Sequence, residues 1–184
     1  MKKLVCGIDE VGRGAVAGPL VIASVVFKKS KKIPYNIKDS KKTTFIQRKL
    51  LFREILNNAY VGVGCIDSQI IDKLGITEAT RLGIAQCISN NISRKDIILL
   101  DGNIKIDSKF KVKSIVKGDN NFVSIAAASI IAKFIRDNIM ILKSNYYPNY
   151  NWKNNKGYGT KDHLLAIKLY GITKYHRKSF KLAH

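Results

Sequence analysis

The sequence of 184 residues predicts a single α/β domain over residues 1–184, with a mixed central β-sheet flanked by helices. Its length and its 46% content of hydrophobic residues suffice for one sizeable core. Short apolar segments typical of strands alternate with segments of helical periodicity, and no repeat or low-complexity linker divides the chain. We expect the first three strands to be antiparallel, the later strands to be parallel, and a helical subregion to occupy about 147–184.

The predicted strands are short apolar runs that end near glycines or acidic residues. Three of them come early and close together, which indicates an antiparallel meander. The fourth is wholly apolar up to Asp101, as in a buried strand flanked by helices. The five runs are KLVCGID (3–9), GPLVIASVVF (18–27), AYVGVGCI (59–66), IILL (97–100) and KVKSIVKGD (111–119).

The predicted helices carry apolar side chains at intervals of three and four residues. In the first, Phe45, Leu51 and Ile55 share one face, and Thr77 is the expected N-cap of the second. The third is long and rich in small residues. The four ranges are 44–58, 77–91, 122–147 and 161–170.

The chain is strongly basic. Its 33 lysines and arginines outnumber its 13 acidic residues and give a formal net charge of +20, the balance expected of a protein that binds phosphate backbones. A second explanation stays open, because most of the basic residues are lysine and the chain is also rich in isoleucine and asparagine. A biased composition could raise the charge without any bound polyanion. Of the two, we favour a nucleic-acid partner.

No segment predicts secretion or membrane insertion. The first apolar run is interrupted at Asp9, and the longest uncharged run, 14–27, is too short to span a bilayer. The three cysteines lie far apart without a Cys-x-x-Cys or histidine-rich partner, so neither a disulfide framework nor a zinc site is expected. We expect a cytoplasmic protein with reduced cysteines and no membrane partner, and we take a monomer as the working expectation.

Four acidic residues follow predicted strands. Asp9 and Glu10 end the first strand, Asp101 ends the fourth, and Asp119 lies in a Lys-Gly-Asp turn after the fifth. Sites in α/β proteins are commonly built at strand ends, and these carboxylates converge if the fourth strand lies beside the first. Clustered carboxylates repel one another unless cations lie between them. Their oxygens suit Mg²⁺ or Mn²⁺, and two such ions about 3.5 to 4 Å apart would activate a water against a phosphodiester.

Each of these acids also has a simpler explanation. An aspartate at a strand end is more often a turn former or a helix cap than a metal ligand. Four such residues together are a weaker coincidence, so the spacing alone leaves a metal site and a structural role equally open.

Seven blocks of the sequence closely resemble the bacterial ribonuclease HII family, in that family's order, and together they cover nearly the whole chain. The related ribonuclease HIII family lacks the Gly-Arg-Gly signature that stands here at 12–14. The blocks are GIDEVGRGAVAGPLV (7–21), DSKK (39–42), LLDGN (99–103), VKGD (116–119), SIAAASIIAKFIRD (124–137), KGYGT (156–160) and HRKSF (176–180).

The resemblance implies an RNase H-like fold and an endonuclease that cleaves the RNA strand of RNA–DNA hybrids. It also implies cutting on the 5′ side of a single ribonucleotide embedded in duplex DNA, which leaves a 3′-hydroxyl and a 5′-phosphate. The expected partners are RNA–DNA hybrids and DNA duplexes that contain ribonucleotides. The family's catalytic, metal-binding acids fall on Asp9, Glu10, Asp101 and Asp119, with Mn²⁺ or Mg²⁺ as the implied cofactor.

Four residues are implied to recognise the substrate. Gly12, Arg13 and Gly14 resemble the family's backbone loop that reads the 2′-hydroxyl, a role that suits glycines because the main chain can then approach a sugar closely. Tyr158 is placed like the family tyrosine that packs on the deoxyribose after the ribonucleotide. Without the resemblance, these residues would be turn formers, a solvated charge and a loop anchor.

Lys41, Lys42 and Lys133 are candidates for contacts to phosphates, which position a duplex without reading its sequence. Exposed lysines on a lysine-rich protein are the competing explanation. His163 and His176 lie in matching blocks, but helix packing or loop hydrogen bonds explain them at least as well as catalysis does. We therefore assign them no chemical role.

Two other functions stay open. A catalytically silent nucleic-acid-binding module would need only the charge of +20, and it predicts salt-sensitive binding to any duplex without cleavage. A metal-dependent nuclease of RNase H-like fold that acts on another substrate, such as a four-way DNA junction, keeps the acids but leaves the Gly-Arg-Gly loop without a purpose. The residues favour the ribonuclease.

Overall fold

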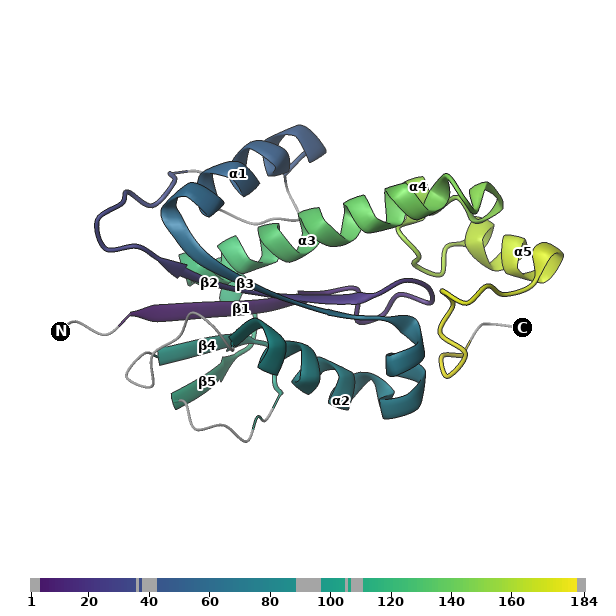
Figure 1. Ribbon diagram of the computed structural model, residues 1–184, viewed down its shortest axis with the longest axis horizontal. Coiled ribbons are helices and arrows are strands. Elements are labelled where there is room, and N and C mark those ends of the chain that lie inside the picture. Colours follow the sequence, from purple (N-terminus) through teal and green to yellow (C-terminus); the bar gives the residue numbers. More distant parts are fainter. Residues whose placement is uncertain are drawn as a thin grey trace.

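A five-stranded mixed sheet forms the centre of the fold (Figure 1). The computed structural model describes residues 4–35, 37, 43–88, 97–104, 106 and 111–181. In the order β3-β2-β1-β4-β5, the first three strands of the chain pair antiparallel, and β1, β4 and β5 pair parallel. This confirms the predicted arrangement. The strands are β1 (Val5–Val11), β2 (Leu20–Phe27), β3 (Ala59–Ile66), β4 (Ile97–Asp101) and β5 (Lys111–Ile115).

β1 and β4 end one or two residues later than predicted, and two further strand boundaries differ because of local backbone conformation. β2 starts two residues later than predicted, since Gly18 has a φ of 83° and Pro19 has no N–H to offer a neighbouring strand. β5 stops short of Asp119, because Lys117 at a φ of 56° turns the chain into the short 3-10 helix η2 (Gly118–Asn120). A helical turn, and not a strand end, therefore presents this acid.

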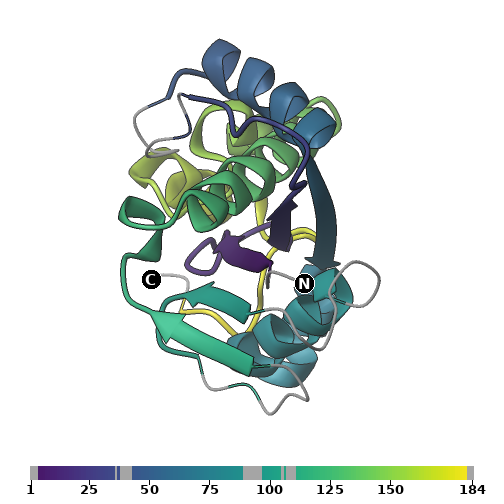
Figure 2. The ribbon, with the colours of Figure 1, turned by 90° about the vertical axis from the view of Figure 1, so that its left-hand side faces the viewer.

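Helices cover both faces of the sheet, as the two views at right angles show (Figures 1 and 2). α2 (Ser68–Ile88) packs on one face and shares a core with Ile8 and Ile22. α1 (Phe45–Asn58) and α3 (Val123–Ser144) pack on the other face, over Val21, Ala23 and Val25. The successive side chains of β2 point to alternate faces of the sheet, and because helices cover both faces, β2 is buried on both sides. None of the described helices is both long enough and apolar enough to cross a bilayer.

The second helix starts nine residues earlier than predicted. α2 begins at Ser68, where the carboxylate of Asp67 accepts a hydrogen bond from the N–H of Ile70 at 2.8 Å. Gly75 interrupts the helix with a φ of 76°, and the predicted start at Thr77 falls just after this kink. The glycine therefore concealed the first part of the helix, because it breaks the apolar periodicity. The end predicted at residue 91 lies outside the described residues.

The C-terminal segment is helical and aromatic, and it packs against the loop that follows β1. Trp152 is fully buried in a small core that includes Ala17 of that loop and Met140 of α3. This packing ties the C-terminal segment to the end of the sheet at which β1 stops. The segment contains η3 (Pro148–Tyr150), α4 (Trp152–Asn155) and α5 (Lys161–Tyr170).

Candidate active site

Two adjacent carboxylates, Asp9 and Glu10, lie near the end of the central strand β1. They pair with Ala23 and Ile22 of β2, so they lie within the strand, which ends at Val11; the prediction that they terminate it was wrong. Because side chains alternate along a strand, Asp9 lies on the α3 face and Glu10 on the α2 face. The two carboxylates therefore reach the strand end from opposite sides of the sheet.

Asp101 lies beside Asp9 because β4 runs parallel to β1. The residues just before these two aspartates are paired in the register of the sheet, so the two chains reach their acids side by side. The Oδ1 atom of Asp101 accepts a hydrogen bond from the N–H of Gly118 at 2.7 Å. This bond ties β4 to η2, which carries the buried Asp119.

These acids disfavour one another's charged forms. Burial raises the pKa of Asp9 to about 6; a hydrogen bond with Ser129 opposes the rise and the charge of Asp101 adds to it. Burial, and then the charge of Asp9, raise the pKa of Glu10 to about 7 against the attraction of Arg13. At neutral pH the charges are thus poorly compensated by the chain itself. A cation between the carboxylates would relieve this repulsion.

The chemistry of these ligands suits a hard divalent cation. Asp9, Glu10 and Asp101 line one cavity, and carboxylate oxygens are the ligands that Mg²⁺ and Mn²⁺ prefer. Within the described ranges, no three His, Cys, Asp or Glu side chains are already close enough together to hold an ion. The residues therefore fit such an ion by type and place, and binding would require their side chains to rotate toward one another.

The cavity beside these acids has a volume of about 340 Å³. Its walls come from the ends of β1 and β4, the loop after β1, α3 and the segment after α4. A larger cavity of about 590 Å³ lies at the C-terminal end of α3, but none of its lining residues is acidic, so the smaller cavity is the candidate site. Its lining residues are Asp9, Glu10, Val11, Gly12, Arg13, Gly14, Asp101, Ser129, Lys133 and Tyr158.

The loop after β1 presents main chain to this cavity. Gly12 has a φ of 97°, and a Cβ atom there would lie 2.1 Å from Nε of Arg136, so a side chain is excluded. A Cβ atom on Gly14 would meet no protein atom within 4 Å. The side chain of Arg13 is bound toward α2, where its Nη1 donates to the hydroxyl of Thr80 at 3.2 Å. Backbone atoms are therefore the groups of this loop best placed to meet a ligand.

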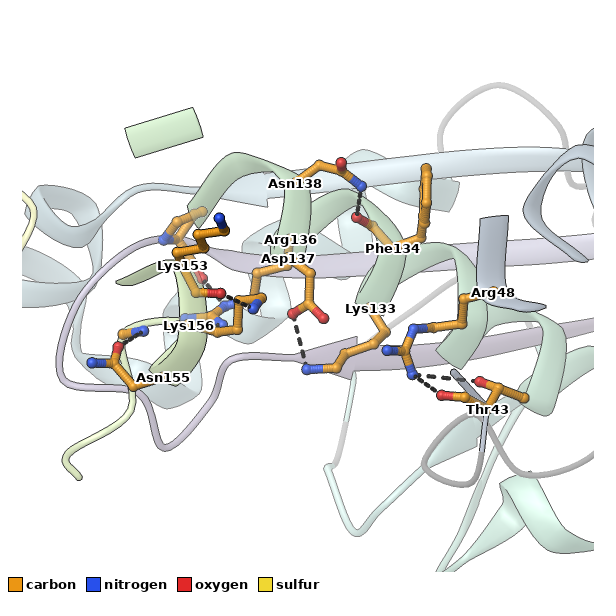
Figure 3. A network of polar contacts seen from close by, with 12 residues as sticks. Thr43, Arg48, Lys133, Phe134, Arg136, Asp137, Asn138, Lys153, Asn155 and Lys156 are labelled. Carbon is orange, nitrogen blue, oxygen red and sulfur yellow. Dashed lines mark hydrogen bonds and ion pairs between the residues drawn. The ribbon is translucent and has the colours of Figure 1, made fainter. Parts of the chain in front are cut away.

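Of the three lysines predicted to contact phosphates, the structure describes one, Lys133. Lys133 lines the cavity, and its ammonium group donates to Asp137 at 2.9 Å, one helical turn further along α3 (Figure 3). This ion pair holds the positive charge at the wall of the cavity. Lys41 and Lys42 lie outside the described residues.

Sequence reasoning missed Ser129, although it lines the cavity and forms a hydrogen bond with Asp9. The signal was present, because Ser129 stands four residues before Lys133 and therefore on the same face of α3. Asp137, another four residues on and 3% exposed, was also missed; it does not line the cavity but pairs with Lys133, which does. One stripe of the helix thus supplies several polar groups at the cavity.

The two histidines belong to the buried C-terminal core. Nε2 of His163 accepts from the indole N–H of Trp152 at 3.0 Å and lies 3.1 Å from Nε2 of His176. Nδ1 of His176 accepts from the N–H of Thr173 at 2.9 Å, so Nε2 of His176 carries its proton and donates to His163. The remaining nitrogen of His163 then donates to the carbonyl of Tyr158 at 2.9 Å. Both rings are neutral and support the Tyr158 segment.

Acidification is expected to destabilise the protein through this histidine pair. Burial, and then the neighbouring His163, lower the pKa of His176 to about 4, below its value of about 6.5 in the unfolded chain. The neutral His176 therefore contributes its full stabilisation of the fold above pH 6.5. As the pH falls toward 4 this contribution is lost, and at pH 5 the loss is about 2 kcal/mol. Urea denaturation of wild type and His176→Gln at pH 7 and pH 5 measures the difference. An equal loss of stability in both proteins would contradict the neutral pair.

Comparison with protein families gives one match over most of the chain. The family model described as Ribonuclease HII matches residues 6–183. The chain is 48% identical over 177 residues to the Ribonuclease HII of Wolbachia sp. subsp. Brugia malayi (strain TRS). The aligned region covers 96% of this chain and 87% of that relative.

Solved structures with the same fold include proteins of this type. The chain is similar to the RNase HII in the PCNA:RNase HII complex from Archaeoglobus fulgidus, with a TM-score of 0.84 at 25% identity, covering 98% of this chain and 96% of that chain. Bst-RNase HIII in complex with Mn²⁺ has a TM-score of 0.70 at 19% identity, covering 98% of this chain and 68% of that one. These likenesses confirm the predicted RNase H-like fold.

Proposed function

Because the chain belongs to the ribonuclease HII family, whose members cleave the RNA strand of RNA–DNA hybrids, we propose that it also nicks duplex DNA on the 5′ side of a single embedded ribonucleotide. The products would carry a 3′-hydroxyl and a 5′-phosphate. One observation carries the proposal: a single cavity brings Asp9, Glu10 and Asp101 together with the Gly12–Gly14 loop and Tyr158. Groups that can act on a phosphate thus share a cavity with groups that can contact a sugar.

In this proposal, Asp9, Glu10, Asp101 and Asp119 would hold two divalent ions. When bound, Mg²⁺ or Mn²⁺ would supply Lewis acidity at the phosphate and lower the pKa of a water nucleophile. The structural relative Bst-RNase HIII is described with Mn²⁺, which agrees with this choice of cation. No covalent intermediate with the enzyme is required.

The chain itself contributes by orienting the carboxylates. Asp9 accepts a hydrogen bond from the N–H of Glu10 at 2.8 Å and forms another with Ser129. Asp101 is oriented by the N–H of Gly118. Because these partners belong to β1, α3 and η2, the relative placement of the acids depends on three elements of the fold. Asp9 and Asp101 are thus held near the cavity by the fold, and only the final rotation of the acidic side chains is left to the binding of the cation.

Recognition of the ribose is assigned to the main chain of the Gly12–Gly14 loop. The 2′-hydroxyl is the group that distinguishes RNA from DNA at a given sugar, and the open space in front of Gly14 lets the sugar approach the backbone. Tyr158 lines the same cavity and would pack on the next deoxyribose. Together the loop and the tyrosine would select a junction from RNA to DNA.

Binding of the duplex is assigned to the basic surface. The net charge of +20 favours a polyanion, and Lys133 places one positive charge at the cavity. Lys41 and Lys42 are retained in the proposal as phosphate contacts. We propose that the protein acts as a cytoplasmic monomer that removes ribonucleotides from DNA.

The test is cleavage of a labelled DNA duplex that contains one ribonucleotide, with Mg²⁺ or Mn²⁺ and then with chelator. Wild type is compared with Asp101→Asn, and an all-DNA duplex is the control. Metal-dependent nicking on the 5′ side of the ribonucleotide, with an end that a polymerase can extend and with loss of cutting in the variant, would support the proposal. Salt-sensitive binding without cleavage under every metal condition would instead indicate a binding module.

Gly14→Ala is expected to impair cutting at a single ribonucleotide while leaving the fold intact. Its methyl group would meet no protein atom within 4 Å but would enter the cavity where the sugar must approach. We expect a loss of about 10- to 100-fold in kcat/KM, with stability within about 1 kcal/mol of wild type. Gly159→Ala is the matched control, since its methyl would make only ordinary contacts from 3.5 Å. Unchanged kcat/KM for Gly14→Ala would argue against a sugar at this position.

A further inference from the structure

Two buried arginines, Arg136 on α3 and Arg177 near the C-terminus, bind the loop at residues 12–19 from inside the protein. Both side chains are 0% exposed. In the described part of the chain, the hydrogen bonds of both guanidinium groups end on main-chain carbonyl oxygens and not on carboxylates. A buried charge is costly unless it is fully hydrogen-bonded, so the loop and these arginines stabilise each other's placement.

Arg136 joins the loop to the segment that carries Tyr158. Its Nε donates to the carbonyl of Pro19 at 2.9 Å and its Nη2 to that of Ala17 at 3.1 Å. Its Nη1 donates to the carbonyl of Lys156 at 2.9 Å, two residues before Tyr158 (Figure 3). Three fixed donors of one planar group thus set the distance between two separate segments of the chain.

Arg136 also contacts both elements to which substrate recognition is assigned. Its guanidinium carbon lies 5.2 Å from the ring centroid of Tyr158. Gly12 packs against the same side chain so closely that an added Cβ atom would lie 2.1 Å from Nε. A change in the position of this one side chain would therefore disturb its contacts with both the glycine loop and the tyrosine.

Arg177 determines the direction of the peptide group between Arg13 and Gly14. Its Nη1 donates to the carbonyl of Arg13 at 3.0 Å, while its Nε and Nη2 both donate to the carbonyl of Gly18 at 3.1 and 3.0 Å. In a trans peptide the N–H points opposite to the C=O. The N–H of Gly14 is consequently held pointing away from Arg177, in a residue that lines the cavity.

We propose that Arg136 and Arg177 are positioning residues that set substrate selectivity. They hold the Gly12–Gly14 loop and Tyr158 at one spacing, and a ribonucleotide followed by a deoxyribonucleotide must match that spacing. This inference rests on the proposed function of the loop and the tyrosine. Neither arginine lines the cavity, so both act through the groups they hold.

The test compares two substrates, a DNA duplex with one ribonucleotide and a hybrid with an all-RNA strand. The hybrid offers a 2′-hydroxyl at every sugar and no deoxyribose after the cut. Its cleavage should therefore depend less on the spacing between the Gly12–Gly14 loop and Tyr158. kcat and KM are measured for wild type and Arg177→Lys, which keeps the charge but loses the planar fork. We expect the ratio of kcat/KM, single ribonucleotide over hybrid, to fall at least tenfold.

Ile84→Val is the control for lost stability, because Ile84 is a buried residue of α2 that packs in the core with Ile22 and does not line the cavity. It should lower the thermal midpoint and leave the ratio unchanged. Equal losses on both substrates in Arg177→Lys, with the ratio preserved, would overturn the proposal by showing a purely structural role.

A milder variant covers the case in which Arg177→Lys does not fold. Phe180→Leu removes the ring 5.0 Å from the guanidinium carbon of Arg177 and so loosens the packing that orients its hydrogen bonds. A smaller fall of the ratio supports the proposal, and an unchanged ratio overturns it. A wild-type enzyme that cuts the hybrid but never the single ribonucleotide would instead refute the proposed function, and with it this inference.

Discussion

Asp9→Asn is expected to abolish cleavage and at the same time make the metal-free protein more stable. Asp9 lies beside Asp101 at the cavity and is assigned to the metal ions of the proposed reaction. Asparagine keeps the size of the side chain but removes the charge that a divalent cation needs. We expect kcat to fall by about 10³-fold or more, a loss of about 4 kcal/mol of transition-state stabilisation.

The gain in stability follows from the cost of the buried charge. Burial raises the pKa of Asp9 to about 6, and the ionised form therefore costs folding free energy at neutral pH. In the presence of chelator, removing that charge should stabilise the protein by about 1 to 3 kcal/mol at pH 7. Asparagine can still accept the hydrogen bond from the N–H of Glu10.

The gain in stability of Asp9→Asn over wild type should depend on pH. The pKa of Asp9 is higher in the folded protein than its ordinary value of 3.8, so its contribution to stability is full below pH 3.8 and is lost as the pH rises through 6. Asparagine has no such dependence. The stability difference between Asp9→Asn and wild type should therefore widen from pH 4 to pH 7 in chelator.

Urea denaturation and cleavage assays on the same preparations measure both effects. Glu54→Gln is the matched control, since Glu54 is an exposed carboxylate on α1 and does not line the cavity. It should leave cleavage and stability unchanged. Wild-type cleavage by Asp9→Asn would exclude this carboxylate from the reaction, and a less stable variant in chelator would contradict the assigned cost of its burial.

Gly7→Ala is expected to cost about 3 to 5 kcal/mol of folding free energy, near the upper end for a single substitution. An added Cβ atom would lie 2.1 Å from the carbonyl carbon of Ser124 and 2.2 Å from the backbone nitrogen of Ile125. These are backbone atoms at the start of α3, so no side-chain rotation relieves the overlap. β1 pairs with β2 and with β4 at this residue, so it is held in place on both sides.

The consequence for the site is a displaced helix. α3 carries Ser129 and Lys133 to the cavity, so lifting its start from β1 should also weaken cleavage. Urea denaturation checks the stability, and Gly14→Ala is the control for that measurement alone, because its methyl meets no protein atom within 4 Å. Wild-type stability of Gly7→Ala would mean that α3 does not pack on β1 as described.

The presence of the five strands and the antiparallel pairing of the first three could be predicted from the sequence because these features depend on local patterns. Apolar runs bounded by turn residues predicted all five strands, and the early meander predicted their antiparallel pairing. The prediction failed for the start of α2, where Gly75 breaks the periodicity but the chain resumes a helix beyond it. Packing against the sheet decides such a case, and local sequence does not record it.

The candidate site was predicted as a set of residues and not as a geometry. The sequence by itself determined which acids lie in or near the ends of the strands, that a glycine loop succeeds the first of them, and that the whole chain carries a charge of +20. These are properties of composition and of neighbours along the chain. They were enough to indicate carboxylate chemistry and a polyanionic partner.

Only the tertiary structure decided how these groups meet. The parallel register of β1 and β4 brings Asp101 beside Asp9, and α3 adds Ser129 to the same cavity. The two buried arginines reach the loop from more than a hundred residues away along the chain. Hydrogen bonds and charge interactions depend on distance in space, so contacts between such remote residues exist only once the sheet and its helices have packed.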